Sequence, residues 1–294
     1  MATSINADAN VGPLAFSVDG KSIHGLCQDL KVRTWNVATG ALQSTLTFDK
    51  DDSPSTLTAS TALSVAKDGT LKTWDLATGK VAKQAKPTGP RARRSTPSPT
   101  DGRFFIAHGE TEIKMRAIDQ MGKEEYVVPS GLGGIASMAV SPDGKNVVAA
   151  SYDADIRAWN SRNGELLRLI DELPVSMFDM KFSPDGKMLA AGGADKTLYF
   201  YDAKTFRQLR TIPKLPEMIS ALAFSPDGTR IATGGFNEIT LKMAVKVHVF
   251  DVKSGAKVHV FDAKQRVSSV VFAPDGRSLA VSTGTKSIEV WQVG

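Results

Sequence analysis

Four histidines and one cysteine are the side chains of this sequence best suited to metal binding or nucleophilic catalysis. They are His24, His108, His248, His259 and Cys27. No histidine has a second ligand at metal-binding spacing, and a single cysteine cannot build a thiolate site. We therefore expect no metal, no cofactor and no catalytic residue, and we interpret the histidines as structural or surface residues of strands.

Two other patterns resemble chemical motifs but lack part of what the chemistry needs. Gly20–Lys21–Ser22 looks like the end of a phosphate-binding loop, but Ala15 stands where that loop needs a glycine and no helix is expected to follow. Aspartates recur at fixed positions in expected turns, which indicates that their carboxylates bond turn amides. No segment resembles a nucleophile elbow.

A basic stretch is the strongest charge feature of the chain. Between residues 79 and 95 there are six basic residues and no acidic one: Lys80, Lys83, Lys86, Arg91, Arg93 and Arg94. The whole chain has a net charge of +5, so the remainder is close to neutral. The stretch either binds an acidic or phosphate-rich surface or is an ordinary solvated loop. Nucleic acid is not the expected ligand, because no aromatic side chains are interleaved for base stacking.

A repeat in the aromatic residues shows which elements must position these side chains. Seven positions share one slot at the end of a strand-like phrase: Trp35, Trp74, Arg116, Trp159, Tyr201, Phe250 and Trp291. The steps between them are 39, 42, 43, 42, 49 and 41 residues. A period near 40 residues with a strand-ending Trp-Asp indicates the blades of a β-propeller.

Each copy of the repeat contains short alternating segments that are typical of strands. A turn of the Ser-Pro-Asp-Gly kind precedes most slots, with its aspartate 16 residues before the aromatic residue in most copies. Four short runs per copy, bounded by turn residues, indicate four antiparallel strands. Seven copies predict an all-β fold, a seven-bladed β-propeller in which large aromatic side chains fill the gaps between adjacent blades.

Several phrases resemble those of the WD-repeat family: FSPDG at 182–186 and 224–228, DGTLKTWD at 68–75, and ASYDADIRAWN at 150–160. In that family a turn aspartate, a strand hydroxyl, the tryptophan and a linker histidine often form a hydrogen-bonded network. The residues that match the aspartate and the hydroxyl are Asp29, Asp68, Asp153, Asp195, Ser151 and Thr283. The linker histidine is absent from every copy, so we expect no complete network and a ring stabilised mostly by packing.

The last copy ends before its fourth strand. An unpaired outer edge would invite pairing with other chains, and in the family that the sequence resembles the N-terminus commonly supplies the missing strand. We therefore predict that residues near 2–7 pair antiparallel with Lys286–Trp291. The sector of the second and third copies should be the least stable, because Arg116 occupies a slot that is expected to be buried.

We assign residues 1–294 to a single propeller domain. The expected blades are 11–47, 48–89, 90–131, 132–171, 172–213, 214–262 and 263–294 with 1–10. No apolar run is long enough to cross a membrane, and the N-terminus does not resemble a signal peptide. One cysteine suits a reducing compartment. A cytoplasmic monomer that does not insert into membranes is therefore expected.

Departures from the repeat fall on the face that carries the linkers between blades and the turns between second and third strands. The sixth copy has seven extra residues within 236–244, which form either a binding loop or a longer hairpin. An acidic linker, FDKDD at 48–52, and the basic stretch lie on the same face. The candidate binding residues are Phe236, Ile239, Leu241, Met243, Tyr152, Lys83, Lys86, Arg91, Arg93 and Arg94.

The resemblance implies a non-enzymatic scaffold that binds a protein or peptide partner on this face. Fold alone does not fix function, so two alternatives stay open. One is a binder of acidic or phosphate-rich surfaces through residues 80–94. The other is a propeller hydrolase or lactonase with a site at the mouth of the central channel.

Overall fold

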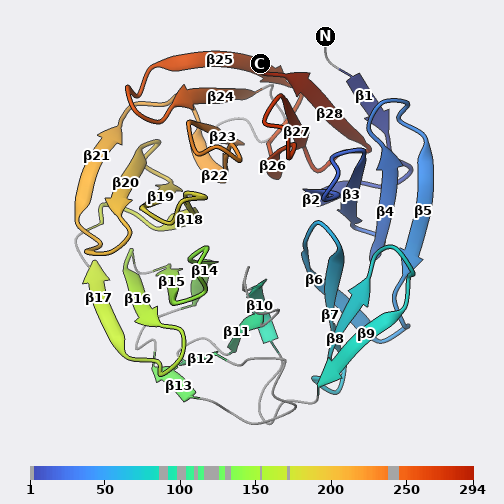
Figure 1. Cartoon of the computed structure of the whole chain (residues 1–294), viewed down its shortest axis with the longest axis horizontal. Helices are drawn as coiled ribbons and strands as arrows, with labels where there is room; N and C mark the ends of the chain where they lie inside the picture. The colour runs from blue at the N-terminus through green and yellow to red at the C-terminus, as the bar shows by residue number, and fades with distance from the viewer. Residues whose placement is uncertain are drawn as a thin grey trace.

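The chain forms a ring of β-sheets around a central opening (Figure 1). The computed structural model describes residues 3–85, 92–97, 104–108, 112–115, 126–129, 134–152, 154–170, 173–237 and 245–294. All regular secondary structure among these residues is β-strand, and six of the sheets contain four antiparallel strands each. We call these six sheets blades and name each one by its innermost strand.

The first two blades follow one another along the chain, and their strands run outward from the opening in chain order (Figure 1). The β2 blade contains β2 (Val11–Phe16), β3 (Ser22–Cys27), β4 (Lys31–Asn36) and β5 (Leu42–Thr47). The β6 blade contains β6 (Asp52–Leu57), β7 (Thr61–Ala66), β8 (Leu71–Asp75) and β9 (Val81–Ala85).

Three further blades have the same order of strands. The β14 blade contains β14 (Ile135–Val140), β15 (Asn146–Ser151), β16 (Ile156–Asn160) and β17 (Leu166–Ile170). The β18 blade contains β18 (Met177–Phe182), β19 (Met188–Gly193), β20 (Leu198–Asp202) and β21 (Gln208–Ile212). The β22 blade contains β22 (Met218–Phe224), β23 (Arg230–Phe236), β24 (Val245–Asp251) and β25 (Lys257–Ala263).

The last blade combines both ends of the chain. The β26 blade contains β26 (Ser269–Phe272), β27 (Ser278–Ser282), β28 (Ser287–Gln292) and, as its outer strand, β1 (Thr3–Asn6). Strand β1 is antiparallel to β28, and Thr3 lies opposite Val290. The predicted closure by the N-terminal segment is therefore confirmed, and Figure 1 shows the two strands side by side.

The prediction of seven four-stranded blades is wrong, because the described residues form six. Between the β6 and β14 blades, the described residues form two two-stranded sheets: β10 (Ala92–Pro97) with β11 (Phe104–His108), and β12 (Glu112–Met115) with β13 (Tyr126–Pro129). No ladder joins β11 to β12 within the described part of this sector. The sequence offers a physical reason. Arg116, which lies outside the described residues, occupies the aromatic slot, and a guanidinium is costly in an apolar gap between sheets.

The aromatic residues of the six blades fill the gaps between sheets, as the repeat predicts. The residues in the six aromatic slots are nearly inaccessible to solvent: Trp35, Trp74, Trp159, Tyr201, Phe250 and Trp291. Trp291 lies in one buried cluster with Val247 and Val249 of the preceding β22 blade. Its ring also stacks on Phe261 of that blade, with ring centroids 4.8 Å apart. The β22 and β26 blades thus bury apolar side chains between their faces, which a lone four-stranded sheet would leave exposed.

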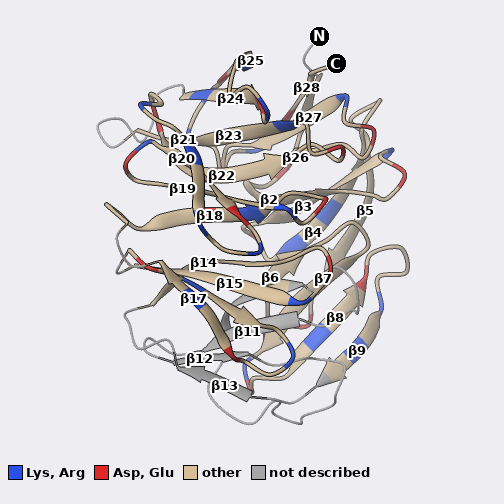
Figure 2. Ribbon diagram, turned by 60° about the vertical axis from the view of Figure 1, so that its left-hand side comes forward, with Lys and Arg blue, Asp and Glu red and all other residues tan. Residues whose placement is uncertain are grey.

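The lower face of the ring carries the turns between first and second strands and between third and fourth strands. The Ser-Pro-Asp-Gly turns close on themselves, since Ser183 donates to Asp185 at 2.6 Å and the Lys187 amide donates to the same carboxylate at 3.0 Å. These hydrogen bonds hold the pKa of Asp185 below its usual value. The interpretation of the repeated aspartates as turn residues is confirmed at this position. Figure 2 shows acidic and basic residues of the described segments both in turns and on strands.

One blade contains a buried relay of hydrogen bonds that the repeat analysis missed. Trp74 Nε1 donates to Ser64 Oγ at 2.8 Å, and Ser64 Oγ donates to Asp52 Oδ2 at 2.9 Å. Ser64 lies two residues beyond Ala62, the partner of Trp74 in the ladder. The matching positions opposite the other three tryptophans hold Gly25, Ala149 and Val281, which have no hydroxyl. The relay is therefore particular to the β6 blade.

The turn aspartates named from the resemblance have local partners instead. Asp29 pairs with Arg33 at 2.6 Å, and Asp195 accepts the Tyr199 hydroxyl at 2.6 Å. Asp68 accepts the Thr70 amide at 2.9 Å. Asp153 lies outside the described residues. These carboxylates therefore fix the turns between second and third strands on the upper face, which also carries the linkers between blades.

The innermost strands carry β-bulges near their upper ends, and hydrogen bonds across blade boundaries satisfy amides beside them. Register shifts occur in β2 and β22, among others. Such a bulge interrupts the ladder locally. The Leu14 amide donates to Ser269 Oγ at 3.3 Å, and the Leu222 amide donates to Asp179 Oδ2 at 2.8 Å. Asp179 also accepts the Met180 amide at 2.9 Å and the Lys181 ammonium at 2.8 Å. It thus ties the β18 blade to the β22 blade.

The closing strand should contribute strongly to stability through one side chain. Ile5 is fully buried and packs in the core with Ile288 and Val290. Ile5→Ala should lower the free energy of unfolding by about 2–5 kcal/mol, because the cavity left behind cannot collapse completely. Ser4→Ala, on the exposed side of the same strand, should change it by less than about 0.5 kcal/mol. Urea unfolding measures both, and equal effects would contradict the assigned register.

Asp179 should stabilise the contact between the β18 and β22 blades. Asp179→Ala leaves the Leu222 amide and the Lys181 ammonium without this partner, so we expect a loss of about 1–3 kcal/mol in the free energy of unfolding. Asp262→Ala is the matched control, since its side chain is 78% exposed and pairs with Lys246 at the surface. Surface pairs contribute little. Chemical denaturation measures the free energy of unfolding of each variant. If Asp179→Ala loses no more stability than the control, Asp179 does not stabilise the contact between the two blades.

Candidate partner-binding face

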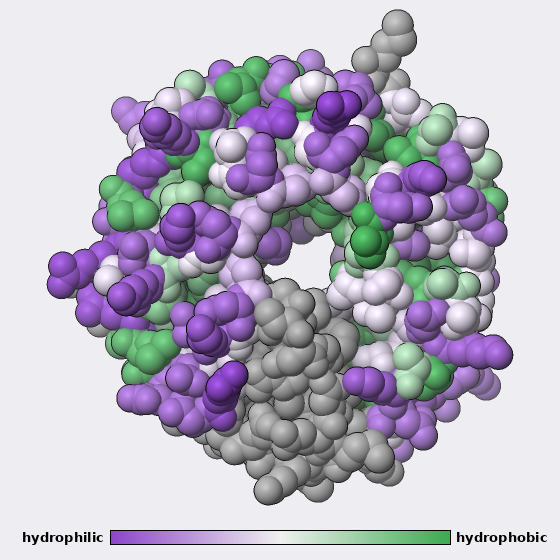
Figure 3. Space-filling view, in the orientation of Figure 1, coloured by the Kyte–Doolittle hydropathy of each residue, from purple (hydrophilic) through white to green (hydrophobic). Residues whose placement is uncertain are grey.

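The central opening is a cavity of about 690 Å³, visible in the space-filling view (Figure 3). Its wall consists of the innermost strands of the six blades together with β10. Most polar groups on this wall are hydroxyls: Ser55, Thr56, Thr96, Ser137, Ser220, Ser268 and Ser269. Asp179 and Lys181 are the only charged residues among the described residues of the wall, and they pair with each other. The described wall is therefore almost neutral.

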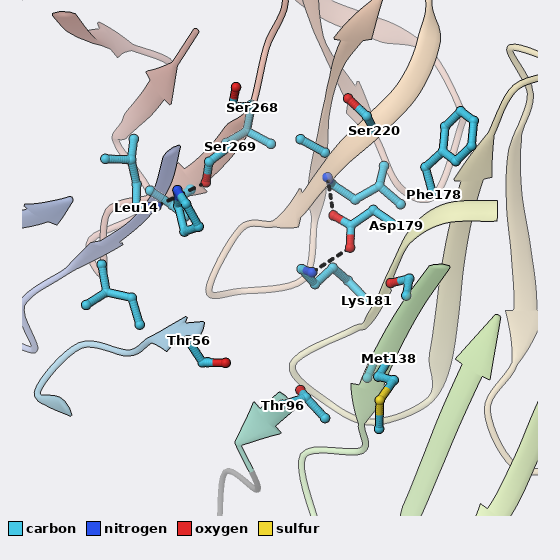
Figure 4. Close-up of a pocket in the computed structure, with 18 of the residues that line it drawn as sticks. Leu14, Thr56, Thr96, Met138, Phe178, Asp179, Lys181, Ser220, Ser268 and Ser269 are labelled. Carbon is cyan, nitrogen blue, oxygen red and sulfur yellow. Dashed lines mark hydrogen bonds and ion pairs between the residues drawn. The ribbon is translucent and has the colours of Figure 1, made fainter. Parts of the chain in front are cut away.

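A pair of phenylalanines and an arginine lie at the upper rim of this cavity. Phe178, in the bulge of β18, stacks on Phe236 at the end of β23, with ring centroids 6.0 Å apart and an interplanar angle of 24°. The guanidinium of Arg266 lies over the Phe236 ring at 4.8 Å from its centroid. In Figure 4 the Phe178 ring lies at the edge of the cavity, whereas Asp179 and Lys181 point toward each other. Three neighbouring segments of the ring thus meet at one point.

The segment that carries Arg266 is held firmly by its neighbours. The Val267 amide donates to the Gly235 carbonyl at 2.8 Å, and Ser220 Oγ donates to the Val267 carbonyl at 3.3 Å. Val267 is fully buried, and a Cβ at Gly234 would approach its side chain to 2.5 Å. Glycine at position 234 therefore allows the linker to pack closely against β23. Arg266 itself is exposed.

Tyr152 lies on the same upper face, in the turn after β15, and the residue is 55% exposed. Its backbone is fixed on both sides, because its amide donates to the Gly134 carbonyl at 3.1 Å and its carbonyl accepts the Ser176 hydroxyl at 2.6 Å. Gly134 has a φ of +45°, and a Cβ there would meet the Tyr152 ring at 2.9 Å. The backbone that carries this exposed side chain is thus anchored by two hydrogen bonds.

Ser176 links this tyrosine to the phenylalanine pair along the chain. It lies two residues before Phe178, in the linker that enters β18. Tyr152, Phe178 and Phe236 therefore come from three successive blades on one face. Of these, Phe178 was missed by the sequence analysis, although a signal was present. The bulges of the β14 and β22 blades hold Ala136 and Ser220, so an aromatic residue in the bulge is a departure from the repeat.

The other candidate residues are only partly covered by the structure. Lys83 is exposed on the outer strand β9. Arg93 and Arg94 lie in β10, an innermost strand as predicted, but their side chains are not described. Five candidates lie outside the described residues: Lys86, Arg91, Ile239, Leu241 and Met243. Binding of an acidic surface by the basic stretch therefore stays a prediction.

The insertion of the sixth copy lengthens a hairpin as well as a loop. Strand β23 continues to Phe236, 11 residues beyond Ser225, whereas β19 ends 10 residues beyond Ser183. Strand β24 begins five residues before its slot at Phe250, compared with three for β20. These extensions account for three of the seven extra residues. The remaining four lie between the two strands, where the connection is eight residues long instead of four.

The histidines whose side chains are described have structural surroundings. His24 Nδ1 lies 2.8 Å from Thr34 Oγ1, and burial lowers the pKa of this imidazole. His248 Nε2 lies 3.2 Å from Glu217 Oε2 in a buried pair, and His259 stacks on Phe261. Within the described ranges, no three His, Cys, Asp or Glu residues form a group that could hold a metal ion. The hydrolase alternative thus has no carboxylate cluster on the described wall of the cavity. No helix of the described residues is long and apolar enough to cross a membrane.

Comparison with known proteins finds repeats of one family in part of the chain. The family model for the WD40 repeat, described as "WD domain, G-beta repeat", matches residues 123–160, 172–202, 207–238 and 255–292. No curated protein matches the chain. The crystal structure of the Cps50 (Swd1) β-propeller domain of Myceliophteria thermophila is similar, with a TM-score of 0.82 and 16% sequence identity.

That match covers 100% of both chains, so the likeness extends around the whole ring. At this sequence identity it shows the fold alone. The repeat matches and the fold agree with each other and with the phrases that end at the buried aromatic slots. The chain therefore carries WD40 repeats and has the β-propeller fold, and its described residues form six four-stranded blades rather than seven.

Proposed function

We propose that this protein is a non-enzymatic interaction scaffold that binds a protein or peptide partner on its upper face. WD40 propellers are generally scaffolds of this kind. The observation that carries the proposal for this chain is the exposed Tyr152, whose backbone is fixed by Gly134 and Ser176. Exposed aromatic side chains on rigid supports bind partners with little loss of conformational entropy, and Tyr is enriched among the residues that dominate interfaces.

The two blades that follow the β14 blade of Tyr152 also carry aromatic side chains on the upper face. Phe178 and Phe236 are only partly buried, and they stack on each other at the rim of the cavity. The described wall of the cavity is lined by hydroxyls and one internal ion pair, which suits partial insertion of a neutral or weakly polar side chain. The outer strands expose single aliphatic residues such as Leu42 and Leu209, which is normal for a soluble surface.

The proposal predicts that partners depend on the upper aromatic residues. Tyr152→Ala combined with Phe178→Ala should reduce capture of at least one specific partner by about tenfold or more, since aromatic residues often dominate binding energy. Quantitative mass spectrometry after affinity capture measures this. Val18→Ala is the control, because Val18 is 76% exposed in a lower-face turn. Circular dichroism melts check that all variants fold. If every partner of the wild-type chain is retained by the double variant, the upper face is not the binding surface.

A further inference from the structure

Several cations around the upper rim pair with carboxylates, whereas Arg266 pairs with no carboxylate of the described residues. Lys181 pairs with Asp179 at 2.8 Å, Lys246 with Asp262 at 2.6 Å and Lys264 with Glu289 at 3.5 Å. No described carboxylate lies within ion-pair distance of Arg266. Its guanidinium lies over Phe236 instead.

This stacking makes Arg266 a suitable anion receptor. A guanidinium that lies on an aromatic ring keeps its N–H donors at the edge of its plane, and it can present two of them to one carboxylate. The linker is fixed by the hydrogen bond from Val267 to Gly235 and by the burial of the Val267 side chain. Less conformational entropy is therefore lost when an anion binds than for a freely mobile arginine.

Apolar surface adjoins this cation on one side. Phe236 connects Arg266 to Phe178, whose ring lies at the edge of the cavity (Figure 4). A ligand that fits both features carries an anionic group next to an aromatic or large aliphatic side chain. Hydroxyls of Ser220 and Ser268 on the cavity wall offer further hydrogen bonds to the backbone of an extended segment.

We propose that Phe178, Phe236 and Arg266 form a docking site for a peptide segment in which an aspartate or glutamate lies next to an aromatic or large aliphatic residue. The carboxylate binds the guanidinium of Arg266, and the apolar side chain packs on Phe178 at the rim of the cavity. This inference names the partner chemistry of the proposed scaffold function and therefore rests on it. It uses only described residues and does not depend on the connection between β23 and β24.

The test is selection of binding sequences from a library of random dodecapeptides displayed on phage, with the full chain immobilised. Synthetic peptides with the selected sequences are then titrated against wild-type protein and variants by fluorescence anisotropy. Sequences in which an acidic residue is adjacent to an aromatic or large aliphatic residue should be enriched. Arg266→Gln should weaken their binding by about tenfold to a hundredfold, as expected for loss of a hydrogen-bonded charge pair.

The controls separate the site from general charge effects. Arg277→Gln makes the same charge change in an exposed lower-face turn of the β26 blade, and it should leave the dissociation constant within about twofold, because exposed charges far from the site are screened by salt. Arg266→Lys keeps the charge but loses the planar fork, so its affinity should be intermediate. Phe236→Leu should also weaken binding, because it removes the ring under the guanidinium.

The possible results distinguish this inference from the function on which it rests. Peptides that lose affinity in Tyr152→Ala or Phe178→Ala but show no acidic preference, or bind Arg266→Gln unchanged, would overturn the inference and leave the scaffold function in place. Failure to select any peptide that competes for the upper face would count against both. A peptide that binds at least tenfold more tightly with phosphoserine in place of the acidic residue would show that phosphate is the true anion and would overturn the assignment to a carboxylate.

Discussion

The antiparallel ladder between β1 and β28 is the interaction on which the rest of this structure depends. It joins the first and last strands of the chain within one blade and places Ile5 in the core beside Val11 and Trp35 of the β2 blade. Because each blade is buried by its neighbours, an open ring would expose an apolar face on either side of the gap. Closure therefore makes the packing of every blade depend on four residues at the N-terminus. The Ala7 amide extends the contact by donating to the Lys286 carbonyl at 2.7 Å.

A closed ring holds its upper rim in place without helices or disulfide bonds among the described residues. The bulged innermost strands are tied across blade boundaries by Asp179 and Ser269. The linker that carries Arg266 is packed by Val267 against Gly234. Side chains on such a rim stay close to one geometry, which is what a recognition surface requires. The lower face differs in character, since its aspartates are occupied by the amides of their own turns.

The sequence predicted the parts of this fold that repeat and failed where the repeat breaks. The spacing of the aromatic slots located the buried rings of six blades, and the missing last strand predicted the closing ladder. Counting slots still gave one blade too many, because Arg116 keeps the spacing but has a guanidinium in place of an aromatic ring. Ser64 was overlooked because its role depends on ladder register, which spacing alone does not give. Phe178 was visible as a departure within a bulge, whereas nothing in the sequence distinguishes Arg266 from other surface arginines.

Native-state hydrogen exchange of the intact protein tests the central claim, that the ladder between β1 and β28 makes the ring one closed unit. The measurement is the free energy of opening for the amides of β1, β28 and the inner strands. If closure is shared by the whole ring, the hydrogen-bonded amides of β1 exchange through the same opening as those of β27 and β28, and their opening energies converge. Rapid exchange of β1, with full protection of β27 and β28, would show that the N-terminal strand frays independently and that the ring is held closed by other contacts.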